Sequence, residues 1–148
     1  MKIAIAADHA GFALKTEIAA WLRQAGHEVV DLGTNNAKSV DYPRFGAKLA
    51  RAIANGEAQR GIALCGSGIG ISIAINREPK CRCARVDDLL SAALAREHND
   101  ANVIALGARL IGIDQARACI AAFIETPFGG GRHQPRVDQL SEPLQASD

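Results

Sequence analysis

A cysteine stands directly before a glycine-rich turn, CGSGIG, at residues 65–70. The run before it is apolar and the residues after it follow a helical pattern, so the turn is expected to join a strand to a helix. Its glycines let backbone N–H groups converge on an anion at the start of that helix. The helix dipole and nearby cations would favour the thiolate of Cys65. The segment therefore predicts a thiol base beside an oxyanion or phosphate cradle.

Other interpretations of this turn stay open. Glycines in such a turn can serve close packing alone, and a cysteine at a strand end is often a small buried hydrophobic residue. Dinucleotide binding fits less well, because the glycines follow the pattern GxGxG rather than GxGxxG and come after the third predicted strand. A Walker loop is excluded, since the chain contains no Gly-Lys-Ser or Gly-Lys-Thr sequence.

Two histidines have neighbours suited to acid–base chemistry or sugar binding. His9 follows Asp8 after the first predicted strand, where the carboxylate could bind sugar hydroxyls or orient the imidazole. A solvated turn is the alternative. His98, followed by Asn99, ends a predicted helix and could act as a general acid, although histidine also favours helix ends through the dipole. The histidines show no metal-ligand spacing, so we expect no metal.

A pair of arginines near the end of the chain could hold a phosphate. Arg132 and Arg136 are four residues apart, which places both guanidinium groups on one face of a helix. Two such forks match a phosphate group, although a surface basic pair is the commoner meaning of this spacing. Arg109 follows the fifth predicted strand and is expected at the same end of the sheet as a third positive charge.

Short apolar runs alternate with helical patterns, which indicates βα units on a parallel sheet. We expect strands at 2–7, 28–32, 61–64, 82–86 and 102–106, and helices at 13–25, 45–55, 69–76, 89–98 and 114–126. This order predicts an α/β fold, a three-layer Rossmann-like sandwich with a five-stranded parallel sheet and a C-terminal helical tail. Ligands of such sheets bind outside the carboxyl ends of the strands, where the turns named above are expected.

The 148 residues, 48% of them hydrophobic, fit one domain with a core at 1–126 and a tail at 127–148. The tail has little core of its own, so we expect it to pack on a second copy in a homodimer. A net charge of +1 provides no broad field for nucleic acid or an anionic membrane. With no apolar run of membrane-spanning length and no leader pattern, we expect a cytoplasmic protein. Cys81, Cys83 and Cys119 are expected to be reduced core residues, the first two on one strand.

Taken together, the motifs resemble the type B ribose-5-phosphate isomerases and their relatives acting on galactose 6-phosphate and allose 6-phosphate. The matching segments are AADHAG at 6–11, DYP at 41–43, CGSGIGISIAIN at 65–76, REHNDANVIALGAR at 96–109 and GGRHQPRV at 130–137. The resemblance implies a cofactor-free aldose–ketose isomerisation through a cis-enediolate, with active sites shared across a homodimer. Ribose 5-phosphate is the first expectation. A six-carbon sugar 6-phosphate and a non-catalytic phosphate-binding module are the alternatives.

The resemblance also implies roles for individual residues. Cys65 would remove the proton beside the carbonyl, His98 would assist ring opening, and Ser67 would stabilise the enediolate with the loop amides. The sugar would be bound by Asp8, His9, Gly66, Gly68, Ile69, Gly70 and Asn99. The phosphate would be held by Arg109, Arg132 and Arg136, and the positions of Tyr42 and His133 match positions near the pocket.

Two features depart from the resemblance. Ser67 stands where many relatives carry threonine, a change that keeps the hydroxyl. The stretch CRCARVDD at 81–88 is more polar and richer in cysteine than the resemblance leads us to expect. This stretch could reshape one wall of the pocket, which bears on the choice of sugar more than on the chemistry.

Overall fold

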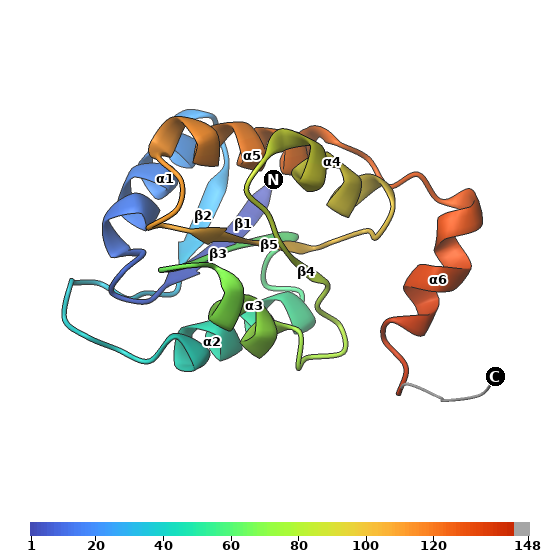
Figure 1. Cartoon of the computed structure of the whole chain (residues 1–148), viewed down its shortest axis with the longest axis horizontal. Coiled ribbons are helices and arrows are strands. Elements are labelled where there is room, and N and C mark those ends of the chain that lie inside the picture. The colour runs from blue at the N-terminus through green and yellow to red at the C-terminus, as the bar shows by residue number, and fades with distance from the viewer. Residues whose placement is uncertain (144–148) are drawn as a thin grey trace.

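The computed structural model describes residues 1–143 and contains one five-stranded sheet with helices on both faces (Figure 1). The strands are β1 (Lys2–Ala7), β2 (Glu28–Asp31), β3 (Arg60–Cys65), β4 (Cys83–Arg85) and β5 (Val103–Gly107). The helices are α1 (Phe12–Gln24), α2 (Tyr42–Ala54), α3 (Ile69–Ile75), α4 (Leu89–Glu97), α5 (Ile113–Glu125) and α6 (Gln134–Gln139), with a 3₁₀ turn, η1 (Gly131–His133). The strand order is β2-β1-β3-β5-β4 and every pairing is parallel. The predicted Rossmann-like sandwich is confirmed.

Alternating side chains of the strands build two separate core layers. In β1, Ile3 and Ile5 pack with α1, α4 and α5, whereas Ala4 and Ala6 pack with α2 and α3. Figure 1 shows these two groups of helices on opposite faces of the sheet. Because successive strand residues point to opposite faces, a strand covered on both sides must be apolar where it is covered, as β1 is from Ile3 to Ala7.

β2 is added on one side of β1, and β3 and the later strands lie on the other side. The boundary between β1 and β3 is therefore the topological switch point of the sheet. The turn after β1 touches the end of β3, since the Asp8 N–H donates to the carbonyl of Leu64 at 3.2 Å. Gly11 permits this approach, because a Cβ there would lie 2.7 Å from the Cβ of Leu64. The turn after β1 therefore lies beside the end of β3, at the carboxyl end of the sheet.

Apart from the start of α2, every expected boundary lies within one residue of the observed one. Helix α2 begins at Tyr42 rather than at residue 45, because Pro43 is compatible with the first turn of a helix. The expectation that Cys81 and Cys83 share a strand is wrong. The N–H of Arg82 pairs with the side chain of Asn102 at 2.8 Å, so the ladder begins only at Cys83.

The burial expected for the three other cysteines is largely confirmed. Cys81 and Cys119 are buried, whereas Cys83 is half-buried.

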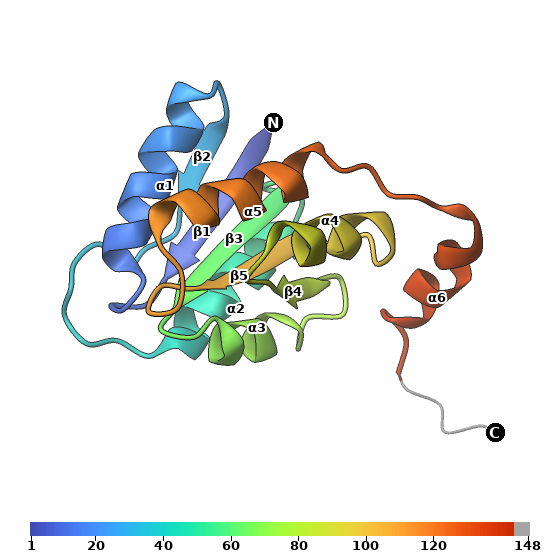
Figure 2. The ribbon, with the colours of Figure 1, turned by 45° about the horizontal axis from the view of Figure 1, so that its top comes forward.

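The tail leaves the core after α5, and α6 stands apart from the sheet on the side where α4 ends (Figures 1 and 2). The Gly129 N–H donates to the carbonyl of Glu97 at 2.9 Å and ties the start of the tail to the end of α4. Residues 144–148 of the predicted tail lie outside the described residues. Within residues 1–143, no helix has both the length and the apolarity needed to cross a bilayer.

Candidate active site

The segment 65–70, here called the cysteine loop, folds back over the end of β3. Gly68 has φ of +75°, a conformation that favours glycine. The Gly68 N–H lies 3.2 Å from Sγ of Cys65, and the Ile69 N–H lies 3.2 Å from Oγ of Ser67. One main-chain donor, the Gly68 N–H, therefore lies beside the thiol, where it is placed to stabilise negative charge on the sulfur. The anion cradle itself stays a prediction.

Backbone contacts with the turn after β5 orient this loop. The Ala108 N–H donates to the carbonyl of Cys65 at 2.9 Å, and the Arg109 N–H donates to that of Gly66 at 3.0 Å. In a trans peptide the C=O and the following N–H point in opposite directions. Because these carbonyls point toward the turn after β5, the N–H groups that follow them point to the opposite side of the loop.

Cys65 itself is buried, with 4% of its surface exposed, and it packs in the core layer under α2 and α3. Its packing fits a small hydrophobic residue as well as a reactive one. The Gly68 N–H directed at its sulfur favours the reactive interpretation.

Two side chains are held in the turn after β1, whose backbone pairs with the end of β3. Oδ1 of the buried Asp8 accepts from the N–H groups of Ala10 and Gly11 at 3.0 and 3.1 Å. Nδ1 of His9 accepts from the Val40 N–H at 3.1 Å, which ties this turn to the polar loop at 33–41. Both side chains are thus held in place at the topological switch.

Glycines of the cysteine loop make room for two further side chains. A Cβ on Gly70 would lie 2.5 Å from Cζ of Tyr42, and one on Gly66 would lie 3.1 Å from Nη1 of Arg109. The phenol ring and the guanidinium therefore rest directly on the loop backbone, and both side chains are exposed at its rim. Tyr42 and Arg109 thus lie against the loop, whereas Asp8 and His9 lie in the turn after β1; the roles expected for them stay predictions.

The remaining predicted residues form a second group, here called the tail cluster. It consists of His98, Asn99, Arg132, His133 and Arg136. The rings of His98 and His133 stack with centroids 4.4 Å apart and planes inclined by 16°. Nη1 of Arg136 donates to the carbonyl of Arg132 at 2.8 Å. Partial burial lowers the pKa of His133, and the positive charges of His98, Arg132 and Arg136 lower it further.

The cysteine loop and the tail cluster of one chain lie at opposite ends of the sheet (Figure 2). Cys65 pairs with Gly107, the last residue of β5, whereas His98 comes before the first residue of that strand. The expectation that Arg109 and the tail arginines share one end is therefore wrong within a single chain. Helix α4 runs antiparallel to the strands, so the residues that follow it, His98 and Asn99, lie at the amino ends of the strands.

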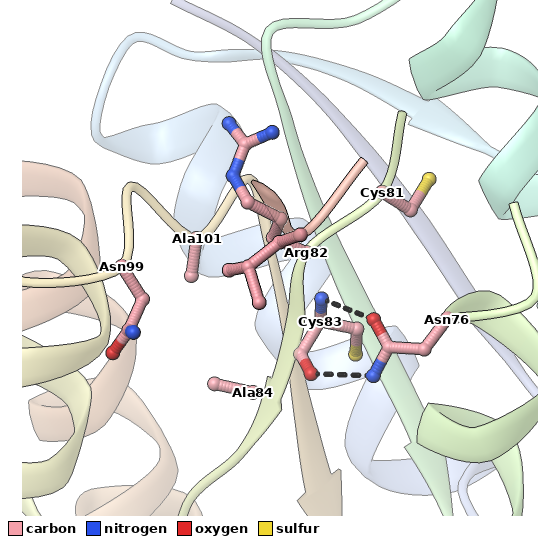
Figure 3. Close-up of a pocket in the computed structure, with 8 residues that line it drawn as sticks. Asn76, Cys81, Arg82, Cys83, Ala84, Asn99 and Ala101 are labelled. Atoms are coloured by element: carbon pink, nitrogen blue, oxygen red, sulfur yellow. Dashed lines mark hydrogen bonds between the residues drawn. The ribbon is translucent and has the colours of Figure 1, made fainter. Parts of the chain in front are cut away.

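A groove of about 360 Å³ lies beside β4, away from the cysteine loop (Figure 3). It is lined by Asn76, Cys81, Arg82, Cys83, Ala84, Asn99, Ala101 and Leu140. Of the predicted site residues only Asn99 takes part. The Asn76 amide pairs with both the N–H and the carbonyl of Cys83, at 2.7 and 2.8 Å, and so covers the free edge of the sheet.

Residues 1–143 contain no group of three or more histidine, cysteine or acidic side chains that could hold a metal ion. The predicted absence of a metal and of a cofactor stays a prediction.

Fold and loop together define a class: an α/β protein that carries a thiol and a glycine-rich loop at the switch point of a parallel sheet. Residues 3–140 match the family model described as Ribose/Galactose Isomerase. The chain belongs to this family, and the resemblance found in the sequence is confirmed.

Individual relatives agree over nearly the whole chain. Ribose-5-phosphate isomerase B of Escherichia coli K12 is 44% identical over 140 residues, which cover 95% of this chain and 94% of the relative. The structure of ribose-5-phosphate isomerase B from Clostridium thermocellum superimposes with a TM-score of 0.95 at 48% identity, covering 96% of both chains. That from Mycoplasma genitalium, with bound ribulose-5-phosphate, gives 0.90 at 37% identity and covers 95% of this chain and 93% of its own.

Proposed function

We propose that this protein is an aldose–ketose isomerase that interconverts ribose 5-phosphate and ribulose 5-phosphate, with Cys65 as the base. The observation that carries the proposal is the Gly68 N–H at 3.2 Å from the Cys65 sulfur, inside the glycine-rich loop. The relatives named ribose-5-phosphate isomerase B, one of them with bound ribulose-5-phosphate, support the choice of sugar.

In the proposed reaction, the thiolate of Cys65 removes the proton from C2 of the open-chain aldose. Electrons move into the C1 carbonyl, the O2 proton passes to O1, and the proton taken from C2 returns to C1. Negative charge develops on the two oxygens of a cis-enediolate. The N–H groups at 66–68 and the hydroxyl of Ser67 are the donors proposed to stabilise this charge, where they lower the barrier most.

The other predicted residues are proposed to open the ring, bind the sugar or bind the phosphate. His98 assists ring opening. The sugar is bound by Asp8, His9, Gly66, Gly68, Ile69, Gly70 and Asn99, with Tyr42 and His133 at the pocket wall. Arg109, Arg132 and Arg136 hold the phosphate.

We further propose that the active protein is a homodimer in which the tail of one copy completes the site of the other. The separation of Cys65 from His98 within one chain supports this, because both are needed in one site. Ile69 and Ile73 on α3 support it too, since 52% and 63% of their surfaces are exposed beside the cysteine loop. Residues 1–148 would then form one domain whose tail, 127–148, packs on the second copy. The free thiols support a reducing compartment, the cytoplasm.

The first test compares substrates without metal. The protein is incubated with ribose 5-phosphate, allose 6-phosphate or galactose 6-phosphate in the presence of EDTA, and ketose formation is measured. The largest kcat/KM should be found for ribose 5-phosphate. A larger value for either six-carbon sugar would favour the alternative substrate, which the family name, Ribose/Galactose Isomerase, also admits.

The second test replaces the base. Cys65→Ala should lower kcat by about 10²–10⁴-fold, the usual effect of losing a general base, while ribose 5-phosphate still binds in calorimetry. Cys83→Ala, which changes a half-buried cysteine of the groove, is the matched control and should retain turnover. Full activity of the Cys65→Ala protein would exclude the proposed base. Binding without turnover by the unsubstituted chain would favour a non-catalytic phosphate-binding module.

A further inference from the structure

An arginine from the polar stretch at 81–88 reaches the cysteine loop. Arg85 is the last residue of β4, and its Nε donates to the carbonyl oxygen of Ser67 at 3.0 Å. Its Nη1 forms an ion pair with the carboxylate of Asp87. Since β5 lies between β3 and β4 in the sheet, the side chain extends across the tip of β5 to make this contact.

The tip of β5 leaves space for this contact. A Cβ on Gly107 would lie 2.8 Å from the carbonyl oxygen of Ser67, and one on Gly68 would lie 2.9 Å from the carbonyl carbon of Leu106. The loop thus sits directly on the backbone of β5. No side chain of Gly107 separates Ser67 from Arg85.

With this contact, three successive carbonyls of the cysteine loop accept hydrogen bonds, those of Cys65, Gly66 and Ser67. Those of Cys65 and Gly66 accept from backbone N–H groups, which any sequence with this fold can supply. The third, that of Ser67, accepts from a side chain. Because Ser67 C=O and Gly68 N–H belong to one peptide plane and point in opposite directions, fixing the carbonyl also fixes the N–H. That N–H is the donor at the Cys65 sulfur.

The charge of the guanidinium strengthens this arrangement. A charge-assisted hydrogen bond is stronger than a neutral one, and a polarised peptide is a better donor at its N–H. Asp87 holds the guanidinium by its Nη1 and leaves Nε directed at the loop. The ion pair is partly exposed, with 27% and 44% of the two side chains accessible, so its main effect is on geometry rather than on global stability.

We infer that Arg85, held by Asp87, is a positioning residue that fixes the Ser67–Gly68 peptide with its N–H directed at the Cys65 sulfur. The effect on turnover rests on the proposed function, whereas the effect on the loop does not. The inference also gives a role to the polar stretch at 81–88 that the resemblance left without one.

The test uses four variants and ribose 5-phosphate. Arg85→Ala should lower kcat by about 10–100-fold, the size of effect that small misplacements of reacting groups cause, with little change in KM. Arg85→Lys should not restore kcat, because an ammonium lacks the planar fork, whereas guanidinium ion added to the Arg85→Ala protein should restore part of it. Asp87→Asn should give a smaller loss. Lys2→Ala, which breaks an exposed ion pair with Glu28 on β2, is the control and should change nothing.

A second measurement does not depend on turnover. Hydrogen–deuterium exchange of the amides at 66–68 should become faster in the Arg85→Ala protein and stay unchanged in the Lys2→Ala protein. Unchanged exchange, or an unchanged kcat in an active enzyme, would overturn the inference. If the unsubstituted chain fails to turn over any of the three sugars, the proposed function fails instead, and exchange alone decides the role of Arg85.

Discussion

The carbonyl oxygen of Ser67 occupies the space that a side chain on Gly107 would need. A Cβ on Gly107 would lie 2.8 Å from that oxygen and 2.9 Å from the Ser67 carbonyl carbon, closer than real Cβ atoms come. Gly107 ends β5 and pairs with Cys65 in the sheet register. The last residue of one strand therefore sets how closely the cysteine loop of another can approach.

We predict that Gly107→Ala moves the cysteine loop. The added methyl group overlaps backbone atoms, which cannot rotate away, so the loop must shift. Overpacking of this kind costs about 1–3 kcal/mol of unfolding free energy, and a displacement near 1 Å costs on the order of 10²-fold in kcat. Urea unfolding and a ribose 5-phosphate assay check both. Gly112→Ala is the control, because no atom lies within 4 Å of its Cβ position; similar losses in both proteins would contradict the prediction.

A subunit-mixing experiment tests the shared site. The Cys65→Ala and His98→Ala proteins should each be almost inactive alone. If each site combines Cys65 of one copy with His98 of the other, a hybrid dimer contains one intact site. After unfolding and refolding an equal mixture, half the dimers are hybrids, so about a quarter of the original activity should return. No recovery, in a mixture shown to contain hybrids, would mean that both residues act within one chain.

The sequence was sufficient to predict the sheet and the position of the cysteine loop because both depend on local patterns. The apolar runs around Ile3 and Ile62 are too short for helices, and the glycines after Cys65 break such a run at a strand end. The prediction that Arg132 and Arg136 lie at the same end of the sheet as Arg109 was wrong within one chain, although the order of the elements indicates their place. A residue between a helix and the next parallel strand lies at the amino end of the sheet, and His98 is such a residue.

Arg85 illustrates what local patterns do not contain. The sequence marks the stretch at 81–88 as unusually polar, and Arg85 with Asp87 suggests an ion pair at a strand end. The contact with Ser67 also requires that β5 lie between β4 and β3 and that Gly107 carry no side chain. These are relations between segments far apart in the chain, so they became visible only in the folded structure. The placement of α6 outside the sheet is of the same kind.

We predict that Asp31→Asn destabilises the fold. Lys15 is almost fully buried, and its ammonium lies 2.5 and 2.6 Å from the two carboxylate oxygens of Asp31. Removing the negative charge leaves a buried cation without its partner, which costs about 3–5 kcal/mol. The exposed pair of Lys2 and Glu28 is the comparison, and Glu28→Gln should cost less than about 1 kcal/mol. Urea unfolding checks both values, and equal losses would refute the difference in burial as the cause.

The final prediction concerns the pH dependence contributed by His133. Partial burial, together with the charges of His98 and the nearby arginines, lowers its folded-state pKa below the ordinary 6.5. Between these two pKa values the unfolded chain binds more protons than the folded one, so the free energy of unfolding rises with pH. The contribution of His133 to the free energy of unfolding is fully present above the ordinary pKa and is lost as the pH falls through the folded-state pKa.

His133→Gln, which cannot be protonated, should therefore reduce the loss of unfolding free energy on acidification from about pH 8 to pH 5. Urea unfolding at several pH values measures this difference, and an NMR titration of the His133 ring should show a midpoint below 6.5. His27→Gln, in the turn between α1 and β2, is the control and should retain the pH dependence that His133 contributes. A midpoint at or above the ordinary pKa would mean that, in solution, the tail does not hold His133 against the ring of His98.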